Sequence, residues 1–502
     1  MKKLFYCLIL SSYSFIYAQD GTLDPSFGDG GKLITNINND EKANGLIIQS
    51  DGKIVVAGYT YTNTYGNDVV CIRYNSDGSL DQSFGFNGIA TFDIQLGSDD
   101  KALAIDIQND GKLILGGYSD NGSDKEALLM RLNSDGSLDT SFGDNGKILT
   151  GYSTNGIPVR QDEYRVVKIH HLTGNIVVGG TSYSASNNSR AIVARYTSTG
   201  TLDETFANEG KFTGLPNSQT TSNYLFSIED LAIKSNGKIT LVGWSNSWFY
   251  LGRLNANGTM DTTFSSDGYN HLWGGRMYGI ELNNDDSFYF TGDIWTAPET
   301  QLYTGRINAN GGGITATPFF FGSIMAAYSF AIEKDTNDKL IVAGYLLNEN
   351  TNQSSFLVGR LLADHSIDNT FGNNGFTTTP FNNSMSRAYD MKIQADGKIV
   401  LAGFSGNNIA LARYNGGVLS TNEPTIYDVQ LYPNPAKDYI HLNFENKIYE
   451  KADYQILDTM GRIVKTGNIS GRINKINISS LNKGVYFFRI ESKNINLKFI
   501  KI

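Results

Sequence analysis

The chain has 502 residues, of which 40% are hydrophobic and 12% aromatic, so it can bury sizeable cores and is not an intrinsically disordered protein. Its net charge is −9 and no segment is rich in Lys and Arg, which argues against a nucleic-acid-binding protein. Glycine is frequent (54 residues), proline is rare (9), and no long segment has the period of an amphipathic helix. We therefore expect an all-β protein of many short strands joined by glycine turns.

The N-terminus reads as a secretory signal peptide, residues 1–18. Two lysines precede the apolar run LFYCLILSSYSFIYA and a polar segment follows it, so we expect cleavage between Ala18 and Gln19. The run is too short for a comfortable membrane span, and no second candidate span follows it. After cleavage Cys71 is the only cysteine, so we expect no intramolecular disulfide.

The next part of the chain repeats one unit seven times. An apolar run that ends in glycine recurs, and an arginine follows each run. The runs are KIVVAG (53–58), KLILGG (112–117), NIVVGG (175–180), KITLVG (238–243), SFYFTG (287–292), KLIVAG (339–344) and KIVLAG (398–403). The arginines are Arg73, Arg131, Arg195, Arg253, Arg306, Arg360 and Arg413. This spacing predicts a repeat architecture built from one supersecondary unit.

Each unit reads as four strands, which in unit one are residues 32–37, 43–49, 53–60 and 68–75. An Asp-Gly pair at residues 51–52 joins the second strand to the third, and such a pair between two strands predicts a hairpin. Four antiparallel strands repeated seven times predict a seven-bladed β-propeller, whose core forms where neighbouring blades pack face to face. Because seven full units are present, we expect the ring to close without a strand borrowed from either end.

The repeat resembles a known family. The pattern DGKIVVAG, followed by Arg-Tyr-Asn and then DGSLDxSFGxxG, is similar to the delta-60 repeat propellers of bacterial exported proteins, over residues 21–415. Unit five, GRINANGGGITATPFFFG, lacks the Leu-Asp and Phe-Gly elements of the pattern. The resemblance implies a fold, because the family has no single agreed activity.

Residues 74–88, YNSDGSLDQSFGFNG, are typical either of a calcium loop or of a turn, because both place oxygen-bearing side chains around a glycine. Across the units the oxygen-bearing residues are lost at positions that a metal would need, whereas Leu-Asp and a phenylalanine persist. We interpret the loop as a buried corner and as the joint between blades one and two. Asp81 would accept backbone N–H bonds, and Phe84 would pack between blades. We expect Arg73 and its equivalents to pair with such aspartates; the alternative is a ring of guanidinium groups that binds an anion.

The repeat ends at residue 415, residues 416–425 read as a linker, and residues 426–502 read as a small β-sandwich. This module closely resembles the type A C-terminal sorting domain of the type IX secretion system, in the motifs LYPNP (431–435), DTMGRIVKTG (458–467), INISSLNKGVYFFRI (476–490) and the final KFIKI. The resemblance implies export across the outer membrane of a Gram-negative cell by that machinery, removal of the module, and a mature protein that is released or held at the cell surface. The sorting-signal residues would be Tyr432, Pro433, Asn434, Pro435, Gly461, Gly484, Tyr486 and Lys501.

No catalytic constellation is evident, so we predict no catalytic residues, no metal and no cofactor. The sequence contains no G-x-S-x-G motif, and Cys71 occupies a mid-strand position typical of a small core residue. The histidines, which show no zinc-binding spacing, are His170, His171, His271, His365 and His441.

All four tryptophans lie between residues 244 and 295, where the repeat is least regular. Trp244 fills a position that is aromatic in most units, which indicates ordinary blade packing, whereas the other three are predicted in loops. Exposed aromatic side chains beside polar groups could form a stacking platform for a sugar or a peptide; the alternative is that they cover a weakened unit five. The candidate ligand-binding residues are Trp248, Trp273, Trp295, His271 and Arg276.

These patterns favour a secreted or surface-attached protein that acts as a binding, scaffold or adhesion module. We expect a monomer with a glycan or protein ligand, handled by the type IX machinery and without affinity for nucleic acid. The alternative is an extracellular hydrolase or lyase with its active site at the propeller axis.

Overall fold

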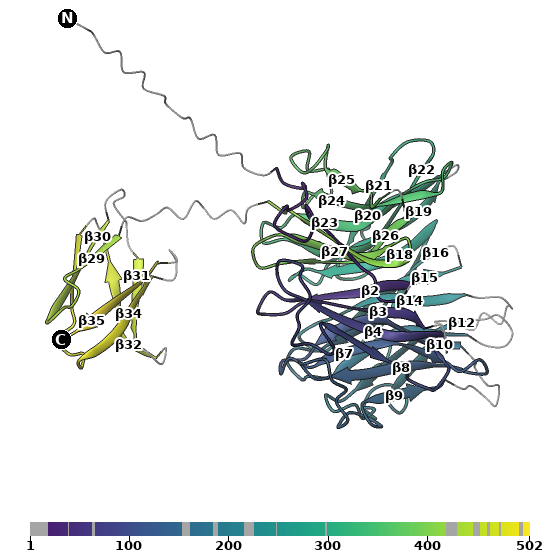
Figure 1. The fold of residues 1–502 in the computed structure, drawn as a ribbon, viewed down its shortest axis with the longest axis horizontal. Coiled ribbons are helices and arrows are strands. Elements are labelled where there is room, and N and C mark those ends of the chain that lie inside the picture. Colours follow the sequence, from purple (N-terminus) through teal and green to yellow (C-terminus); the bar gives the residue numbers. More distant parts are fainter. Residues whose placement is uncertain are drawn as a thin grey trace, which may run out of the picture. The chain divides into compact units, whose positions relative to one another are not determined.

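The computed structural model describes residues 19–38, 40–62, 66–152, 161–183, 189–214, 225–246, 248–296, 299–382, 384–417, 429–444, 452–458, 462–470, 473–490 and 495–502. Contacts divide the chain into two units, Met1–Leu419 and Ser420–Ile502. All regular elements of the described residues are β-strands (Figure 1), as the composition predicts. No helix able to cross a lipid bilayer occurs among the residues that the structure describes.

The described strands of the first unit form seven antiparallel groups of four, and a single parallel residue pair links two of these groups. The first strands are β2 (Glu41–Ile48), β6 (Asp99–Ile107), β10 (Gln161–Ile169), β14 (Phe226–Ile233), β18 (Gly275–Leu282), β22 (Met325–Lys334) and β26 (Ser386–Ile393). The second strands are β3 (Ile54–Thr62), β7 (Leu113–Asp120), β11 (Ile176–Tyr183), β15 (Ile239–Ser245), β19 (Phe288–Thr296), β23 (Leu340–Asn348) and β27 (Ile399–Ser405). The third strands are β4 (Gly66–Tyr74), β8 (Lys125–Leu132), β12 (Ser189–Tyr196), β16 (Trp248–Leu254), β20 (Glu299–Ile307), β24 (Gln353–Leu361) and β28 (Asn408–Tyr414). The outer strands are β5 (Ile89–Phe92), β9 (Lys147–Thr150), β13 (Lys211–Gly214), β17 (Tyr269–Trp273), β21 (Thr315–Phe319), β25 (Phe376–Thr379) and β1 (Lys32–Thr35).

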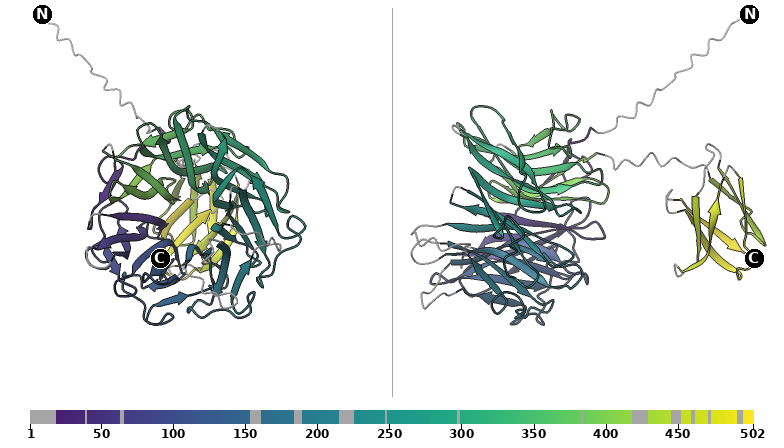
Figure 2. Two further views of the ribbon diagram at one scale, coloured as in Figure 1. Left: turned by 90° about the vertical axis from the view of Figure 1, so that its right-hand side faces the viewer. Right: turned by 180° about the vertical axis from the view of Figure 1, so that it is seen from behind.

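The expectation that the ring closes without a borrowed strand is wrong. β1, predicted as the first strand of blade one, pairs with β28 and is the outer strand of the last blade. Each first strand contacts the next one, and β26 contacts β2, so the blades follow one another round a ring (Figure 2, left). One blade is therefore made from both ends of the repeated region, which fixes the N-terminal residues to the last unit.

The core of the ring lies between neighbouring blades. The apolar runs found in the sequence are the second strands, and β3 is buried along almost its whole length because both of its faces are covered. Seven clusters of buried side chains each join two adjacent blades; one of them joins Val55 and Cys71 of the first blade to Leu115 and Met130 of the second. Burial of apolar surface between blades is thus the main stabilising force.

The glycine that ends each apolar run has a geometric cause. Every first strand carries a β-bulge, for example between Ala43 and Gly45 in β2, opposite the glycine of the second strand. A Cβ atom on Gly58, or on any of its six equivalents, would collide with a backbone carbonyl oxygen of the first strand. The bulge therefore requires glycine there, and it leaves one extra residue of each first strand at the centre of the ring.

The second unit consists of two sheets with one core between them. One sheet contains β29 (Val429–Tyr432), β30 (Tyr439–Phe444) and β33 (Ile473–Asn477), and the other contains β32 (Ile463–Ile469), β31 (Ala452–Leu457), β34 (Gly484–Ile490) and β35 (Ile495–Lys501). Ile440, Leu442, Ile456 and Phe488 are fully buried between the sheets. The predicted β-sandwich is confirmed.

Candidate functional site

The repeated arginine is part of the framework. In six units its Nε donates to the corner aspartate at 2.6–2.8 Å, as predicted, and the pairs are Arg73–Asp81, Arg131–Asp139, Arg195–Asp203, Arg253–Asp261, Arg360–Asp368 and Arg413–Asp24. Arg131 also donates from Nη1 to the carbonyl of Ser198 in the next blade at 2.6 Å. Burial opposes the ionisation of Asp24, but hydrogen bonds from Ser26 and Lys398 and the charge of Arg413 lower its pKa to about 2. Each corner therefore holds a neutralised, structural ion pair.

The loop at residues 74–88 is a turn within one blade, because it connects β4 to β5. The interpretation of this segment as the chain's joint between blades one and two is therefore wrong. Its side chains nevertheless act as predicted: Asp81 accepts the N–H of Ser83 at 3.0 Å, and Phe84 is fully buried. The corner also reaches the neighbouring blade, since the N–H of Gly85 donates to the carbonyl of Asp135 at 2.8 Å.

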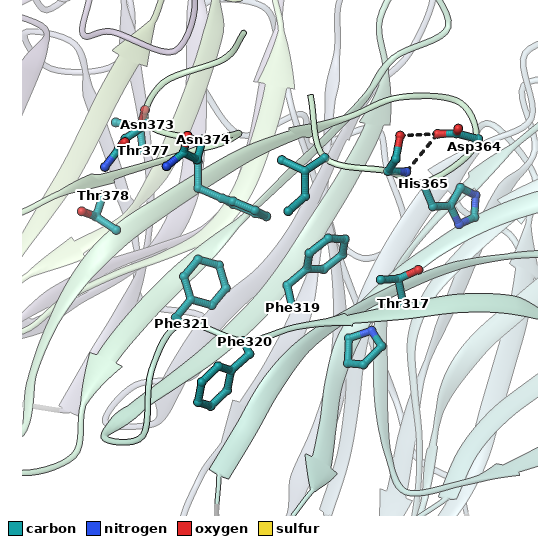
Figure 3. A pocket seen from close by; sticks show the side chains of 14 residues that line it. Thr317, Phe319, Phe320, Phe321, Asp364, His365, Asn373, Asn374, Thr377 and Thr378 are labelled. Carbon is teal, nitrogen blue, oxygen red and sulfur yellow. Dashed lines mark hydrogen bonds between the residues drawn. The ribbon is translucent and has the colours of Figure 1, made fainter. Parts of the chain in front are cut away.

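Unit five lacks this corner, and a hollow of about 890 Å³ lies beside its outer strand β21. Figure 3 shows Phe319, Phe320 and Phe321 along one side of the hollow, with Asn373 and Asn374 of the next blade across from them. Without a corner aspartate, Arg306 pairs instead with an exposed acid, Asp285, at 2.7 Å. The hollow thus lies where the corner of unit five is missing.

His365 occupies the position that is glycine in the equivalent turn of unit one, Gly78. There, a Cβ on Gly78 would touch the ring of Phe27, the corner phenylalanine of the preceding blade. Unit five supplies no such ring, and the buried His365 side chain packs on Tyr289 of that blade, with ring centroids 5.1 Å apart. Burial, reinforced by the charge of Arg306, lowers the pKa of His365. His365 therefore fills the space that the missing phenylalanine leaves.

The seven extra residues at the bulges surround a cavity of about 390 Å³ at the centre of the ring. In chain order they are Asn44, Leu103, Arg165, Glu229, Tyr278, Phe330 and Tyr389. Three aromatic rings from consecutive blades form one wall, with centroids 4.6 Å apart for Tyr278–Phe330 and 5.4 Å apart for Phe330–Tyr389. Opposite them Arg165 pairs with Glu229 at 3.3 Å. The repeated blades thus place six different residue types, with tyrosine present twice, at one level.

We call this cavity, together with the first-strand residues at its two ends, the axial channel. The end at which the first strands begin is rich in cations. The residues two positions before each bulge residue are Lys42, Lys101, Glu163, Ser227, Arg276, Tyr328 and Arg387. The guanidinium of Arg276 lies between two indole rings, 4.8 Å from the Trp244 centroid and 5.2 Å from that of Trp295. Beside it Asp293 is 1% exposed and accepts no hydrogen bond of normal geometry. Burial raises the pKa of Asp293 to about 6, although Arg276, Trp295 and Tyr278 act in the opposite direction.

The other end of the channel is acidic. Asp106, Asp230, Glu281, Glu333 and Asp390 lie around it, together with two lysines. Most of these acids brace neighbouring blades; for example, Asp390 accepts the N–H of Leu46 at 2.7 Å. Glu281 differs, because burial and the charge of Glu333 raise its pKa to about 7.

The structure brings together only part of the predicted tryptophan platform. Trp248, Trp273 and Trp295 lie at strand ends and not in loops; Trp248 and Trp273 are register partners, and the side chain of Trp273 lies outside the described part of the chain. Trp295, 40% exposed, does meet Arg276, as described above. The described ring contacts of His271 are with Phe226, Tyr250 and Tyr269 of its own blade.

Two elements of this site were missed in the sequence. Trp244, assigned to ordinary packing, is the second ring around Arg276 and donates from Nε1 to Glu229 at 2.7 Å. The bulge residues have no single residue type in common, so they give no repeated letter in the sequence. The signal for them is the repeated glycine of the second strand. The bulge residue follows the first-strand residue that pairs with this glycine, as Asn44 follows Ala43, the partner of Gly58.

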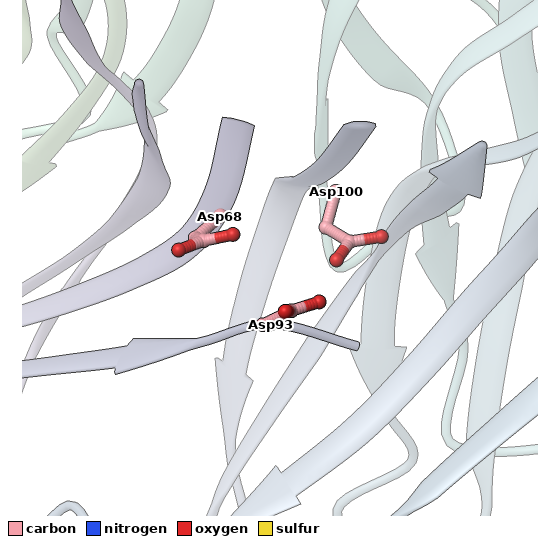
Figure 4. Close-up of side chains that lie close together, drawn as sticks. All are labelled: Asp68, Asp93 and Asp100. Carbon is pink, nitrogen blue, oxygen red and sulfur yellow. The ribbon is translucent and has the colours of Figure 1, made fainter. Parts of the chain in front are cut away.

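Three carboxylates from β4, β6 and the segment after β5 converge between the first two blades, as Figure 4 shows. Asp68, Asp93 and Asp100 each offer an oxygen within 4.8 Å of the others, a donor type that suits calcium. Burial and the charges of the other two acids raise the pKa of Asp68. Asp100 already accepts the N–H of Ile94 and the hydroxyl of Ser98, so its orientation is explained by packing alone.

In the second unit, the sorting-signal motif forms hydrogen bonds to the last strand, β35. Asn434 donates from its side-chain amide to the carbonyl of Lys498 and accepts the N–H of Ile500, both at 2.9 Å. Gly484 and Lys501 are register partners at the ends of β34 and β35, and Tyr486 donates its hydroxyl to the carbonyl of Asn482. The ring of Tyr432 stacks on His441, and the bonds preceding Pro433 and Pro435 are cis. Gly461 lies outside the described residues.

Comparison with family models confirms both resemblances. Residues 430–502 match a family described as a secretion system C-terminal sorting domain. Residues 49–84, 108–142, 173–206, 234–264 and 394–416 match a family described as a domain of unknown function (DUF5122) β-propeller. None of these segments covers residues 265–393, which contain the unit without a corner. The sorting domain marks a protein secreted through the type IX system to the cell surface or the extracellular space.

No curated protein matches the chain. Solved structures with a similar fold include the polysaccharide lyase Uly1, at 12% identity and a TM-score of 0.41 over 81% of this chain and 94% of that one. They also include Sqt1 from Chaetomium thermophilum, at 9% identity and a TM-score of 0.41 over 77% and 100%, and Drosophila Semaphorin 2a, at 8% and 0.40 over 97% and 99%. At these values the likeness carries nothing about ligand or activity.

Proposed function

We propose that this secreted β-propeller is a binding protein whose ligand enters the axial channel. The observation that carries the proposal is the set of seven bulge residues: their side chains range from an arginine and a glutamate to a leucine and three aromatic rings, although the backbone of every first strand carries the same bulge. A selective site needs such asymmetry, whereas the corners repeat the same ion pair and cannot define one ligand.

The aromatic wall gives the site its apolar contact area. Tyr278, Phe330 and Tyr389 are all partly exposed toward the cavity, and aromatic rings are effective anchors for ligands that have both apolar and polar faces. Of the five candidate residues predicted from the sequence, we keep Trp295 and Arg276 in the site, at the cationic end of the channel.

The test is a thermal-shift screen of the purified secreted protein against extracellular polysaccharides and peptides. Ligands that stabilise the protein are then titrated against a Tyr278→Ala/Tyr389→Ala variant and against Phe86→Ala, an exposed aromatic residue in the turn before the outer strand β5, as the matched control. We expect the channel variant to lose affinity at least about tenfold, or 1.4 kcal/mol, and the control to bind as the parent does. Equal binding by all three proteins would refute an axial site.

A hydrolase or lyase is the second candidate, and one observation favours it. Glu281, with its raised pKa of about 7 beside Glu333, has the properties of a general acid in a pair of carboxyl groups. An enzyme would cleave a polymer that it binds and would lose turnover, but not binding, in Glu281→Gln. If the protein only binds, neither the parent nor Glu281→Gln changes the polymer length, as measured by size-exclusion chromatography.

A further inference from the structure

Cations and aromatic rings alternate around the cationic end of the channel. The ammonium of Lys42 lies 4.8 Å from the Phe404 centroid, and the guanidinium of Arg387 lies 4.6 Å from that of Tyr345. Lys101 lies 4.6 Å from the ring of Tyr59. With Arg276 between its two tryptophans, these groups span the first, second, fifth and seventh blades. We call Lys42, Lys101, Arg276 and Arg387 the axial cations.

Three of the four axial cations differ from the corner arginines in how their charge is balanced; the fourth, Lys101, pairs with Asp99 at 3.3 Å. Each corner arginine touches a buried carboxylate within 2.8 Å, so its charge is neutralised. Among the described residues, no ion pair joins Lys42, Arg276 or Arg387 to an acid, and the Nε atoms of both arginines have no hydrogen-bond partner. A ring face holds a cation in place without cancelling its charge. Arg276 is subject to the negative charges of Asp293 and Glu229, but neither carboxylate forms an ion pair with it in the described part of the chain. These three groups are therefore positioned and still able to pair with an anion.

We infer that the cationic end of the channel binds an acidic polysaccharide, with its carboxylate or sulfate groups on Lys42, Arg276 and Arg387 and a sugar face on Trp295. This inference rests on the proposed binding function and names its ligand class. Guanidinium groups recognise planar anions through two parallel hydrogen bonds, and an indole that is 40% exposed offers a face for sugar C–H groups.

A nucleic acid fits this surface less well. Nucleic-acid binding depends on neutralising many phosphates along a strand, and this chain offers three unpaired axial cations within a net charge of −9. An acidic peptide would supply the anions, but its backbone has no repeating ring face to stack on Trp295. The arrangement therefore favours a short stretch of charged sugar, held at several points around the channel mouth.

The experiment compares polygalacturonate, alginate and chondroitin sulfate with carboxyl-reduced polygalacturonate, which keeps the backbone and loses the charge. Binding to the full secreted protein is measured by calorimetry, at low and at high salt. We expect at least one acidic polymer to bind at least about tenfold more tightly than the reduced polymer, and its affinity to fall as salt screens the contacts. Arg276→Gln, Arg387→Gln and Lys42→Gln should each weaken binding about tenfold or more. Lys211→Gln is the matched control, because Lys211 packs on Tyr152 on an outer strand, with 5.5 Å to the ring centroid.

Several outcomes would overturn the inference. In one, the reduced polymer binds as tightly as the acidic polymer, and Tyr278→Ala/Tyr389→Ala binds neither. The axial site would then stand, but its ligand would not need to be acidic. Equally tight binding of single-stranded poly(dT) would point to a general polyanion surface. If no acidic polymer binds, or if the axial variants bind as Lys211→Gln does, the assignment to these cations fails. The salt dependence of the parent protein tests the same point if a variant does not fold.

Discussion

The corner ion pairs predict a large difference in stability between two substitutions of the same kind. In Asp139→Asn, both Arg131 and Lys112 lose an anion that each contacts at 2.7 Å, while the guanidinium stays buried. Removing one partner of a buried pair costs about 3–5 kcal/mol, because the remaining charge is left without compensation. In Asp285→Asn it is Arg306 that loses its anion. The side chains of Arg306 and Asp285 are 40% and 61% exposed, so the loss of stability should be at most about 1 kcal/mol.

The assay is urea unfolding followed by tryptophan fluorescence. All four tryptophans lie between residues 244 and 295, so the signal reports on the propeller and not on the sorting domain. We expect the free energy of unfolding to fall by about 3 kcal/mol or more in Asp139→Asn and to change little in Asp285→Asn. If the free energy of unfolding falls by the same amount in both variants, within about 1 kcal/mol, then burial is not the reason that the corner pair stabilises the protein.

Three further predictions follow from titratable groups. Because the pKa of Asp24 is depressed to about 2 in the folded state, its contribution to stability is present above pH 4 and is lost as the pH falls through 2; acid titration by circular dichroism should therefore show unfolding with proton uptake in this window. Burial raises the pKa of the Cys71 thiol to about 12, so iodoacetamide at pH 8 should leave the native protein unmodified and alkylate it once in urea, as read by mass spectrometry. Asp293 ionises near pH 6 beside Arg276, so binding of an acidic polymer should weaken from pH 5 to pH 7.5 in the parent but not in Asp293→Asn, as measured by calorimetry.

The repeated strands and corners could be predicted because their causes are local. An apolar run that is buried on both faces, an Asp-Gly turn, and an arginine eight residues before an aspartate are all visible within one unit. The pairing of β1 could not be predicted in this way. A repeat can be divided at any point, and residues 32–35 carry the same pattern whether they begin the first blade or complete the last.

The channel was harder to predict because its seven bulge residues share a position but no single residue type. Asn44, Leu103 and Arg165 have nothing in common in the sequence except a place opposite a glycine on another strand. The placement of the tryptophans in loops is wrong for a related reason: residues outside the repeat pattern give no strand signal, although β19 extends through Trp295 and carries its ring to Arg276. Arg276 was found because it lies near these tryptophans in the sequence.

The same unit therefore uses cations in two ways, and the difference lies in what surrounds them. At the corner, a guanidinium meets a carboxylate and a phenylalanine, as Arg73 meets Asp81 and Phe84, and its charge is used up inside the protein. At the axis, Arg387 meets the ring of Tyr345 and its charge stays available. Six of the seven blades share the corner as a framework element, so we expect selectivity to arise where the repeat varies more freely. The bulge provides that freedom, since the glycine opposite it fixes the backbone and leaves the side chain at the axis unconstrained.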